Sequence, residues 1–305
     1  MATLKGNNLR IFAYDDTASK YKCVGMATSC VITLTNNVDQ TQTKDDVGLT
    51  TKPVTTSKSW QVQVESLDVS DVGAMLTAIK AQTKFKLMWA ETNTAYPQTP
   101  ITATNFNRTG YAYISDATFA FNDRENSTKS LTFTGSGPVE PVIGQTPSEA
   151  VAVNGFTKGQ FVRLFLSGDN TTTPASVVAA AKQLSLHISM TMESSVTKDT
   201  EGEWDVQEAT ELSYDITSNA LVRSSETISS SVGGQSLNDL EMIYANGTPV
   251  EWQIANVSGA NNRTKGSVIV SGSALLTQLQ INAAVKQSAT YQATLNGYGD
   301  YTVGS

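Results

Sequence analysis

The sequence predicts a mainly β protein built from two tandem domains, and three observations support this prediction. A chain of 305 residues suits two domains of ordinary size, each with its own core. Charged residues make up only 16% of the chain, and Ser and Thr run through nearly every segment, which favours strands and turns over helices. The third observation is that one succession of strand-like segments occurs twice.

The opening segments of the two halves match. Residues 8–14, Asn-Leu-Arg-Ile-Phe-Ala-Tyr, and residues 161–167, Phe-Val-Arg-Leu-Phe-Leu-Ser, each place an arginine inside an apolar strand. The next predicted strands, 29–35 and 183–191, each lead into a polar loop that contains Thr-Lys-Asp, and these two tripeptides are 154 positions apart. Internal repetition of this kind decides the fold, so it takes precedence over any single element.

The repeat continues along both halves. Trp60 and Tyr214, also 154 positions apart, lie in matching alternating strands. Ser70 and Ser236 are candidate N-caps of two short helices, at 70–80 and 236–244, because an acidic residue follows each one closely. The remaining matched strands are 84–89 and 250–254, then 107–114 and 262–269, which both begin with Asn-Arg-Thr, and finally 130–137 and 290–297.

A linker separates the two copies. Residues 137–147, Gly-Pro-Val-Glu-Pro-Val-Ile-Gly-Gln-Thr-Pro, have the density of Pro and Gly that is typical of linkers. We therefore expect a first domain at 1–140, a linker at 141–158 and a second, diverged domain at 159–305.

Four segments of the first half carry a family resemblance. They are Gly-Asn-Asn-Leu-Arg-Ile-Phe at 6–12, Ala-Thr-Ser-Cys-Val-Ile-Thr-Leu at 27–34, Lys-Ser-Trp-Gln-Val-Gln-Val-Glu-Ser-Leu at 58–67 and Leu-Thr-Phe-Thr-Gly-Ser-Gly-Pro at 131–138. These segments resemble the major tail proteins, or tail tube proteins, of siphophages. The resemblance covers residues 1 to about 140 and reaches the second half through the internal repeat. The inner tubes of contractile tails share the same domain, so the type of tail stays open.

The resemblance implies both a fold and an assembly. Each tail tube domain would be a β-sandwich or partial barrel with one flanking α-helix and a long β-hairpin arm. Six such domains form a ring, so a chain with two domains would form trimeric rings with pseudo-sixfold symmetry, stacked into a tube for DNA ejection. The partners implied are further copies of the chain, the terminator, tape measure and baseplate proteins of the tail, and double-stranded DNA in transit. The location implied is the virion tail, assembled in the host cytoplasm, with no membrane partner.

A DNA conduit needs a polar or acidic lining with few cations, because Lys and Arg would hold the polyanion. Several predicted strands alternate between apolar side chains and polar ones that carry hydroxyls, amides or acids. The residues we expect to face the lumen are Thr33, Thr35, Gln61, Gln63, Glu65, Ser185, Ser189, Thr191, Glu211, Ser213 and Asp215.

The long polar segments 36–57 and 194–209 each lie between two predicted strands, as a hairpin arm would. The resemblance suggests that these arms reach the neighbouring ring. The residues expected to make inter-ring contacts are Lys44, Asp45, Asp46, Lys198, Asp199 and Glu201.

The sequence favours a protein without catalytic chemistry, cofactor or metal. Its one histidine, His187, lies in the middle of an alternating strand, and no nucleotide-binding fingerprint is present. Cys23 and Cys30 lie in one short region and are expected to be reduced. The net charge of −7 argues against a regulator that binds nucleic acid.

Two other classes of protein remain as alternatives. The first is a two-domain β-sandwich binding module of a tail-tip or surface protein, for which exposed Trp and Tyr in loops would be the sign. Trp60, Trp89 and Trp252 lie instead in strands with core-like alternation, and Trp204 lies in a loop. The second is a glycosidase-like enzyme, which would need two carboxylates converging on a cleft.

Overall fold

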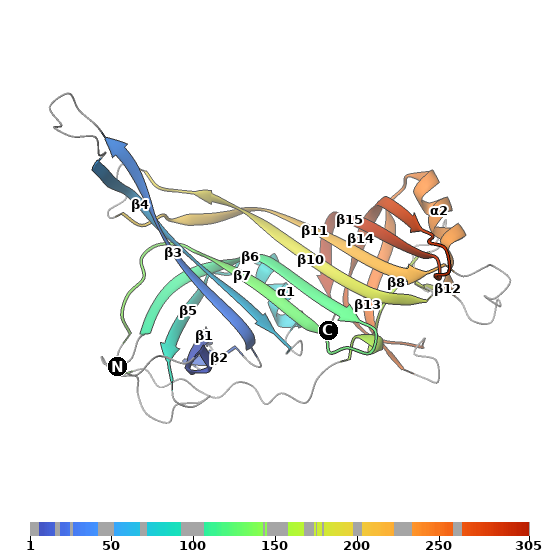
Figure 1. The fold of residues 1–305 in the computed structure, drawn as a ribbon, viewed down its shortest axis with the longest axis horizontal. Coiled ribbons are helices and arrows are strands. Elements are labelled where there is room, and N and C mark those ends of the chain that lie inside the picture. Colours follow the sequence, from blue (N-terminus) through green and yellow to red (C-terminus); the bar gives the residue numbers. More distant parts are fainter. Residues whose placement is uncertain are drawn as a thin grey trace.

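The strands of the chain form one extended β-sheet. The computed structural model describes residues 6–15, 19–24, 27–41, 52–67, 72–92, 107–142, 144, 158–167, 174, 176–178, 180–197, 203–222, 234–258 and 264–304. These residues contain a 15-stranded sheet and two short α-helices (Figure 1). The prediction of a mainly β fold is confirmed. In this part of the chain no helix has the length and apolar character needed to cross a membrane.

The two halves contain matching series of elements. The first half contains η1 (Gly6–Asn8), β1 (Leu9–Asp15), β2 (Lys20–Cys23), β3 (Ala27–Thr41), β4 (Lys52–Ser66), α1 (Val72–Lys80), β5 (Phe85–Glu91), β6 (Asn107–Asn122) and β7 (Thr128–Gly135). The second half contains η2 (Gly159–Phe161), β8 (Val162–Leu166), β9 (Ser176–Val178), β10 (Ala181–Ser194), β11 (Gln207–Leu221), β12 (Gly234–Gln235), α2 (Leu237–Asn246), β13 (Val250–Ser258), β14 (Thr264–Asn282) and β15 (Thr290–Val303).

The strands pair in the same order in both halves. The order β3-β4-β7-β6 in the first half corresponds to β10-β11-β15-β14 in the second. The start of β6 pairs with β5 and then β1, and the start of β14 pairs with β13 and then β8. We give one name, the inner sheet, to the eight strands β3, β4, β7, β6, β10, β11, β15 and β14.

Residue-level pairing repeats as well. The two corresponding long strands, β6 and β14, each carry a β-bulge. The bulge in β6 lies between Ile114 and Asp116, and the bulge in β14 lies between Leu276 and Gln278. Within each bulge a hydroxyl donates a hydrogen bond across the ladder. Ser115 donates to the Thr132 carbonyl at 3.3 Å, and Thr277 donates to the Thr294 carbonyl at 3.3 Å.

One sequence match does not survive this comparison. Arg108 lies opposite Trp89 in the β5–β6 pair, and Val270 lies opposite Ile254 in the β13–β14 pair. Pairing therefore equates Arg108 with Val270, which comes six positions after Thr264, the last residue of the second Asn-Arg-Thr. The match of the two tripeptides is therefore wrong as an alignment, although β6 and β14 have corresponding places in the sheet.

Within the described residues, the four inner strands of the first half pair with the four of the second at one place, which we call the internal seam. There residues 116–122 of β6 pair antiparallel with residues 183–189 of β10, from Asp116 opposite Ser189 to Asn122 opposite Gln183. A second contact lies between α1 and β15. The Tyr301 hydroxyl donates to the Leu76 carbonyl at 2.7 Å, and the Lys80 ammonium donates to the Tyr301 carbonyl at 2.7 Å. Both contacts tie the first half to the second.

An aromatic side chain and a glycine pack together at matching positions of the two cores. Trp60 is buried, and its indole N–H donates to the Gly137 carbonyl at 3.0 Å. A Cβ at Gly135 would overlap the Trp60 ring, and a Cβ at Gly297 would lie 2.5 Å from the Tyr214 ring. The close approach of backbone to ring therefore needs glycine at both positions. Trp89 and Trp252 are also buried, which confirms the core assignment of the three strand tryptophans.

The predicted helix start at Ser236 is confirmed. Its hydroxyl accepts a hydrogen bond from the backbone N–H of Asp239, and the Asp239 carboxylate accepts one from the backbone N–H of Ser236, which is a capping box. The other predicted cap, Ser70, lies outside the described residues.

The segment 36–57 is largely strand rather than loop. β3 and β4 stay paired as far as Thr41 opposite Lys52, so a two-stranded arm projects from the body (Figure 1). The segment 194–209 follows a shorter pairing that ends at Ser194 opposite Gln207. The expectation of hairpin arms is consistent with both pairings.

Replacing Gly135 with alanine is expected to destabilise the fold by about 1–3 kcal/mol, because the new methyl group would overlap the Trp60 ring in a packed core. Thermal unfolding would measure the change. Gly73→Ala is the control, since its Cβ would meet only Val303 at 3.5 Å and alanine favours the helix that contains it. Equal unfolding midpoints for the native chain and Gly135→Ala would contradict this packing.

Candidate functional site: the polar face of the inner sheet

The eleven residues expected to face a lumen lie on one face of the inner sheet. Pairing places Thr33 opposite Gln61 in the first half, and Ser189 opposite Ser213 in the second. Side chains at directly opposed positions share a face, and alternate residues along each strand stay on it. The other predicted positions, Thr35, Gln63, Glu65, Ser185, Thr191, Glu211 and Asp215, have the same parity in β3, β4, β10 and β11. We call this surface the polar face.

Four further strands add residues to this face beyond the eleven expected in the lumen. They are Asp116 and Thr118 in β6, Thr132 and Thr134 in β7, Gln278 and Gln280 in β14, and Thr294 and Asn296 in β15. The alternation of residues 116–122 continues the strand beyond its predicted end at 114. The bulge after Ile114 reverses the parity there, which hides the continuity of the strand.

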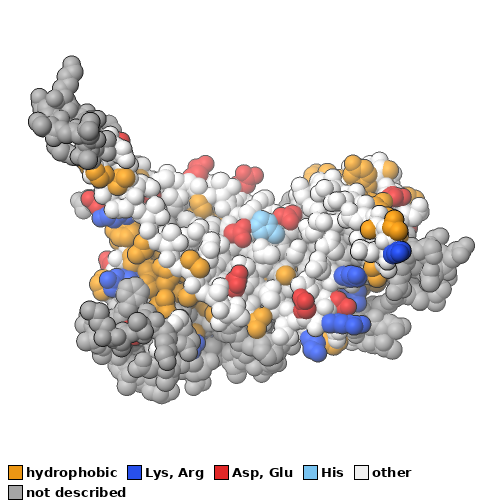
Figure 2. Space-filling view, in the orientation of Figure 1, with side chains coloured by type: hydrophobic (Ala, Val, Ile, Leu, Met, Phe, Trp, Pro, Cys, Tyr) orange, Lys and Arg blue, Asp and Glu red, His pale blue; other side chains and the backbone are white. Residues whose placement is uncertain are grey.

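The polar face carries hydroxyls, amides and carboxylates. None of the residues named on it is Lys or Arg. Figure 2 shows Lys and Arg side chains towards the two ends of the molecule in this view, whereas acidic groups are spread over the centre. The opposite side of the same strands holds the buried residues of the core, including Val62, Phe133, Ile188 and Ile216.

His187 joins three strands on the polar face. Its Nε2 lies 2.7 Å from a carboxylate oxygen of Asp116 on β6, and its Nδ1 lies 2.8 Å from a carboxylate oxygen of Asp215 on β11. Figure 2 shows the pale blue histidine between acidic side chains. Burial of the ring lowers the pKa of His187, but hydrogen bonds and charge from Asp116 and Asp215 outweigh burial, so its pKa is raised above the ordinary 6.5. The cluster fastens the internal seam.

This cluster is built to hold strands rather than to move a proton. A general base needs a free ring nitrogen directed at a nucleophile, and here a carboxylate occupies each nitrogen of His187. The nearby hydroxyls of Ser189 and Ser213 hydrogen-bond to each other at 2.7 Å. The described residues also include no group of His, Cys, Asp and Glu suited to holding a metal ion.

The six residues expected to make inter-ring contacts, at 44–46 and at 198, 199 and 201, lie outside the described residues. The described bases of the two arms touch each other. Lys58 of β4 forms an ion pair with Glu203, and the backbone N–H of Asp205 donates to the Lys58 carbonyl at 2.8 Å. Trp204, expected in a loop, is partly buried at this junction.

Comparison with known proteins assigns the second half of the chain. Residues 157–303 match the family model described as phage tail tube protein. This half of the chain belongs to the phage tail tube protein family. The chain therefore has a structural role in a tail tube, a component of a virion. No curated protein matches the chain.

Several solved tail structures are similar to about half of this tail tube chain. The tail of an empty gene transfer agent particle aligns with a TM-score of 0.39 and 12% identity, over 49% of this chain and 99% of that one. The virion of the native gene transfer agent aligns with a TM-score of 0.35 and 13% identity, over 49% of this chain and 99% of that one. The SPP1 tail tube aligns with a TM-score of 0.34 and 14% identity, over 48% of this chain and 78% of that one. The family assignment rests on the match of residues 157–303.

The His187 cluster should make stability depend on pH. Because the pKa of His187 is higher in the folded chain, its contribution is fully present below about pH 6.5 and is lost as the pH rises through the folded-state pKa. The stability gap between the native chain and His187→Gln should therefore be larger at pH 5.5 than at pH 8.5. The change should be less than about 1 kcal/mol, since all three side chains are more than a third exposed. Urea unfolding at both pH values measures it, and a gap that does not change with pH would refute it.

Proposed function

We infer that the chain carries two tail tube domains, at 1–140 and 159–305, joined by the linker 141–158. Three copies form a ring with pseudo-sixfold symmetry, and rings stack into the tail tube. Matching strand orders, matching bulges and matching glycine–aromatic contacts in the two halves support the duplication. The family match of residues 157–303 extends to the first half through these correspondences.

The unpaired edges of the inner sheet are the observation that supports assembly into a ring. In the described residues β3 pairs only with β4, and residues 275–282 of β14 pair only with β15. Each of these edges presents unpaired backbone N–H and C=O groups, which tend to pair with another chain. The two edges belong to opposite ends of the inner sheet, so joining them is a head-to-tail contact, which yields a closed ring if the rotation per copy permits.

The polar face would line the conduit for DNA. A sheet that closes into a barrel keeps its apolar side chains in the core on one side and turns its polar side chains to the other. The named residues of the polar face carry hydroxyls, amides and carboxylates but no cation. The carboxylates repel phosphate, and no Lys or Arg among these residues supplies the positive charge that would bind it. DNA would then pass without being held.

The arms would connect successive rings. The β3–β4 arm extends the sheet beyond the body, and Lys44, Asp45 and Asp46 belong to its tip by sequence. In the sequence, Lys198, Asp199 and Glu201 come between the paired ends of β10 and β11. The tube would meet terminator, tape measure and baseplate proteins within the tail, and its assembly would take place in the host cytoplasm.

A binding module is the second candidate, and exposed tyrosines are what favours it. Tyr111, Tyr244 and Tyr298 are about half exposed or more. They lie on β6, α2 and β15, however, and so do not come from one loop cluster. A role of this kind would not need the chain to assemble into rings.

Negative-stain electron microscopy of the purified chain across a concentration series tests the function, together with native mass measurement of any rings. We expect hollow tubes, or trimeric rings with six-lobed outlines. A monomer that persists at every concentration would instead support the binding module.

A lysine on the polar face should make the tube hold DNA. Gln63 is exposed on β4 and lies on this face, so Gln63→Lys adds a cation to the conduit of every copy without altering the core. Native tubes and a Gln63→Glu control should retain no DNA in a filter-binding assay. Gln63→Lys tubes should retain DNA at low salt and release it at high salt. Equal retention by all three would show that the polar face does not line the conduit.

A further inference from the structure

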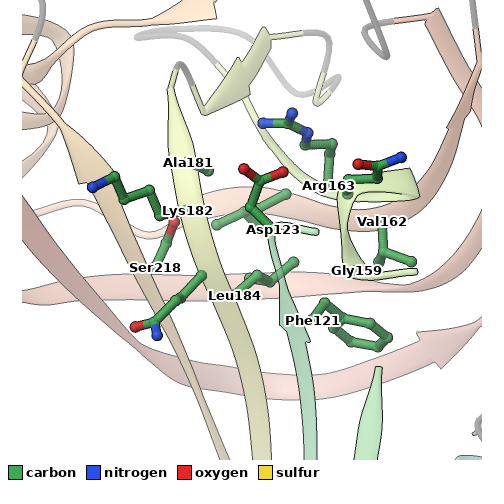
Figure 3. A pocket seen from close by; sticks show the side chains of 12 residues that line it. Phe121, Asp123, Gly159, Val162, Arg163, Ala181, Lys182, Leu184 and Ser218 are labelled. Atoms are coloured by element: carbon green, nitrogen blue, oxygen red, sulfur yellow. The ribbon is translucent and has the colours of Figure 1, made fainter. Parts of the chain in front are cut away.

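At the end of the internal seam, the β6–β7 turn inserts into a pocket of the second half. We call residues 121–125 the plug, and the pocket lined by Gly159, Val162, Lys182 and Leu184 the socket. In Figure 3, Phe121 and Asp123 from the end of β6 lie between the segment of Gly159 and Val162 and the strand that carries Leu184. The space left at this joint is only about 10 Å³, which is about the size of one water molecule. The backbone N–H of Asp123 donates to the Lys182 carbonyl at 2.8 Å, and the N–H of Gly159 donates to the Glu125 carbonyl at 3.0 Å. The β6–β7 turn is therefore seated firmly in the second half.

Gly159 is what allows this close fit. A Cβ at position 159 would overlap the backbone of Asn122 and lie 2.6 Å from the carbonyl carbon of Phe121. Backbone atoms cannot give way as a flexible side chain can, so any larger residue would push the plug out of the socket.

The corresponding socket in the first half is open. Corresponding strand positions equate Gly159 with Gly6, Arg163 with Arg10 and Leu184 with Cys30. Gly6, Arg10 and Cys30 line a cavity of about 240 Å³. A Cβ at Gly6 would have no heavy atom of a described residue within 4 Å. No described residue packs closely enough on Gly6 to require a glycine there, although its counterpart Gly159 is closely packed.

The second half also carries a second plug. The β14–β15 turn corresponds to the β6–β7 turn at a constant spacing of 162 positions, as the opposed pairs Ala112–Gly135 and Ala274–Gly297 show. Both turns have a left-handed residue at the same point, Arg124 with φ 61° and Lys286 with φ 64°. The N–H of Glu125 donates to the Asn122 carbonyl at 3.4 Å, and the N–H of Gln287 donates to the Ala284 carbonyl at 3.2 Å. The two turns thus have the same shape, and among the described residues only the first is seated in a socket.

The free edges beside the open socket expose apolar side chains whose counterparts are buried. Leu34 of β3 is 59% exposed, whereas its counterpart Ile188 in the internal seam is 1% exposed. Ile281 of β14 is 48% exposed, whereas its counterpart Phe119 is 0% exposed. Apolar groups on an unpaired sheet edge lose this exposure when a strand of matching pattern adds to it.

We propose that the β14–β15 turn of one copy fills the open socket of the next copy, and that β14 pairs with β3 in the register of the internal seam. Leu34 then lies opposite Leu279 of the neighbouring copy, Ile32 opposite Ile281, and Cys30 opposite Ala283. Gly6 packs against the neighbour's backbone at 283 and 284. This contact rests on the proposed assembly into rings and names the residues that make it.

Substituting Gly6 separates assembly from folding. Gly6→Ala and the larger Gly6→Val should keep the thermal midpoint of the native chain, because their side chains enter open space. Both should lose tube formation at concentrations at which the native chain forms tubes. Gly73→Ala, on α1, is the matched control and should form tubes normally. The proposal is wrong if Gly6→Val forms tubes as readily as the native chain.

Cysteine cross-linking tests the register independently. In Ala283→Cys the new thiol should lie opposite Cys30, a free thiol of the neighbouring copy. Mild oxidation of assembled protein should give a denaturing-gel ladder that stops at the trimer. Gln280→Cys is the off-register control. Its thiol is three residues along the strand from the expected partner, roughly 10 Å away and on the other face, so the cross-linked product should be lost.

The outcomes separate the contact from the function. Tubes that form while Ala283→Cys gives no ladder, or while Gln280→Cys gives the stronger one, would overturn the register and leave the tail tube function standing. A native chain that stays monomeric under all conditions would overturn both.

Discussion

Antiparallel backbone pairing between β6 and β10 is the constraint on which the rest of this structure depends. It joins two sheets into one, and it does so with the apolar residues of both strands on the same side. A shift of a single residue would move every side chain of β10 to the wrong face, so burial of Leu186 and Ile188 fixes the register. The polar face is continuous across the two halves because this register is held.

The His187 cluster shows how the polar face remains acidic without weakening the seam. Asp116 and Asp215 lie on strands either side of β10, and two carboxylates so close together would repel each other. An imidazole between them offsets that repulsion and bridges the three strands. A lysine could have done the same with a longer reach, but it would have placed a permanent cation on the surface that we propose as the lining of a DNA conduit.

The internal seam and the proposed seam between copies differ where their tasks differ. The internal seam is formed once, on folding, and it is sealed by Phe119, Phe121 and the His187 bridge. The corresponding residues at the free edges are Ile281, Ala283 and Thr33, which bring less apolar area and no charge. An edge that must stay soluble before assembly cannot be as adhesive as one that is covered from the start. The proposed duplication would therefore give one strong and one weaker version of the same contact.

The sequence by itself determined which residues face the core and which form the polar face, because alternation along a strand is a local property. Trp60, Trp89 and Trp252 could be assigned to the core, and the Ser236 cap recognised, for the same reason. Only the tertiary structure decided that β6 continues past its bulge, that His187 meets two aspartates, and that Arg108 does not correspond to the second Asn-Arg-Thr. Those features depend on pairing between residues far apart in the chain, where the register is set by packing of whole sheets rather than by any segment alone.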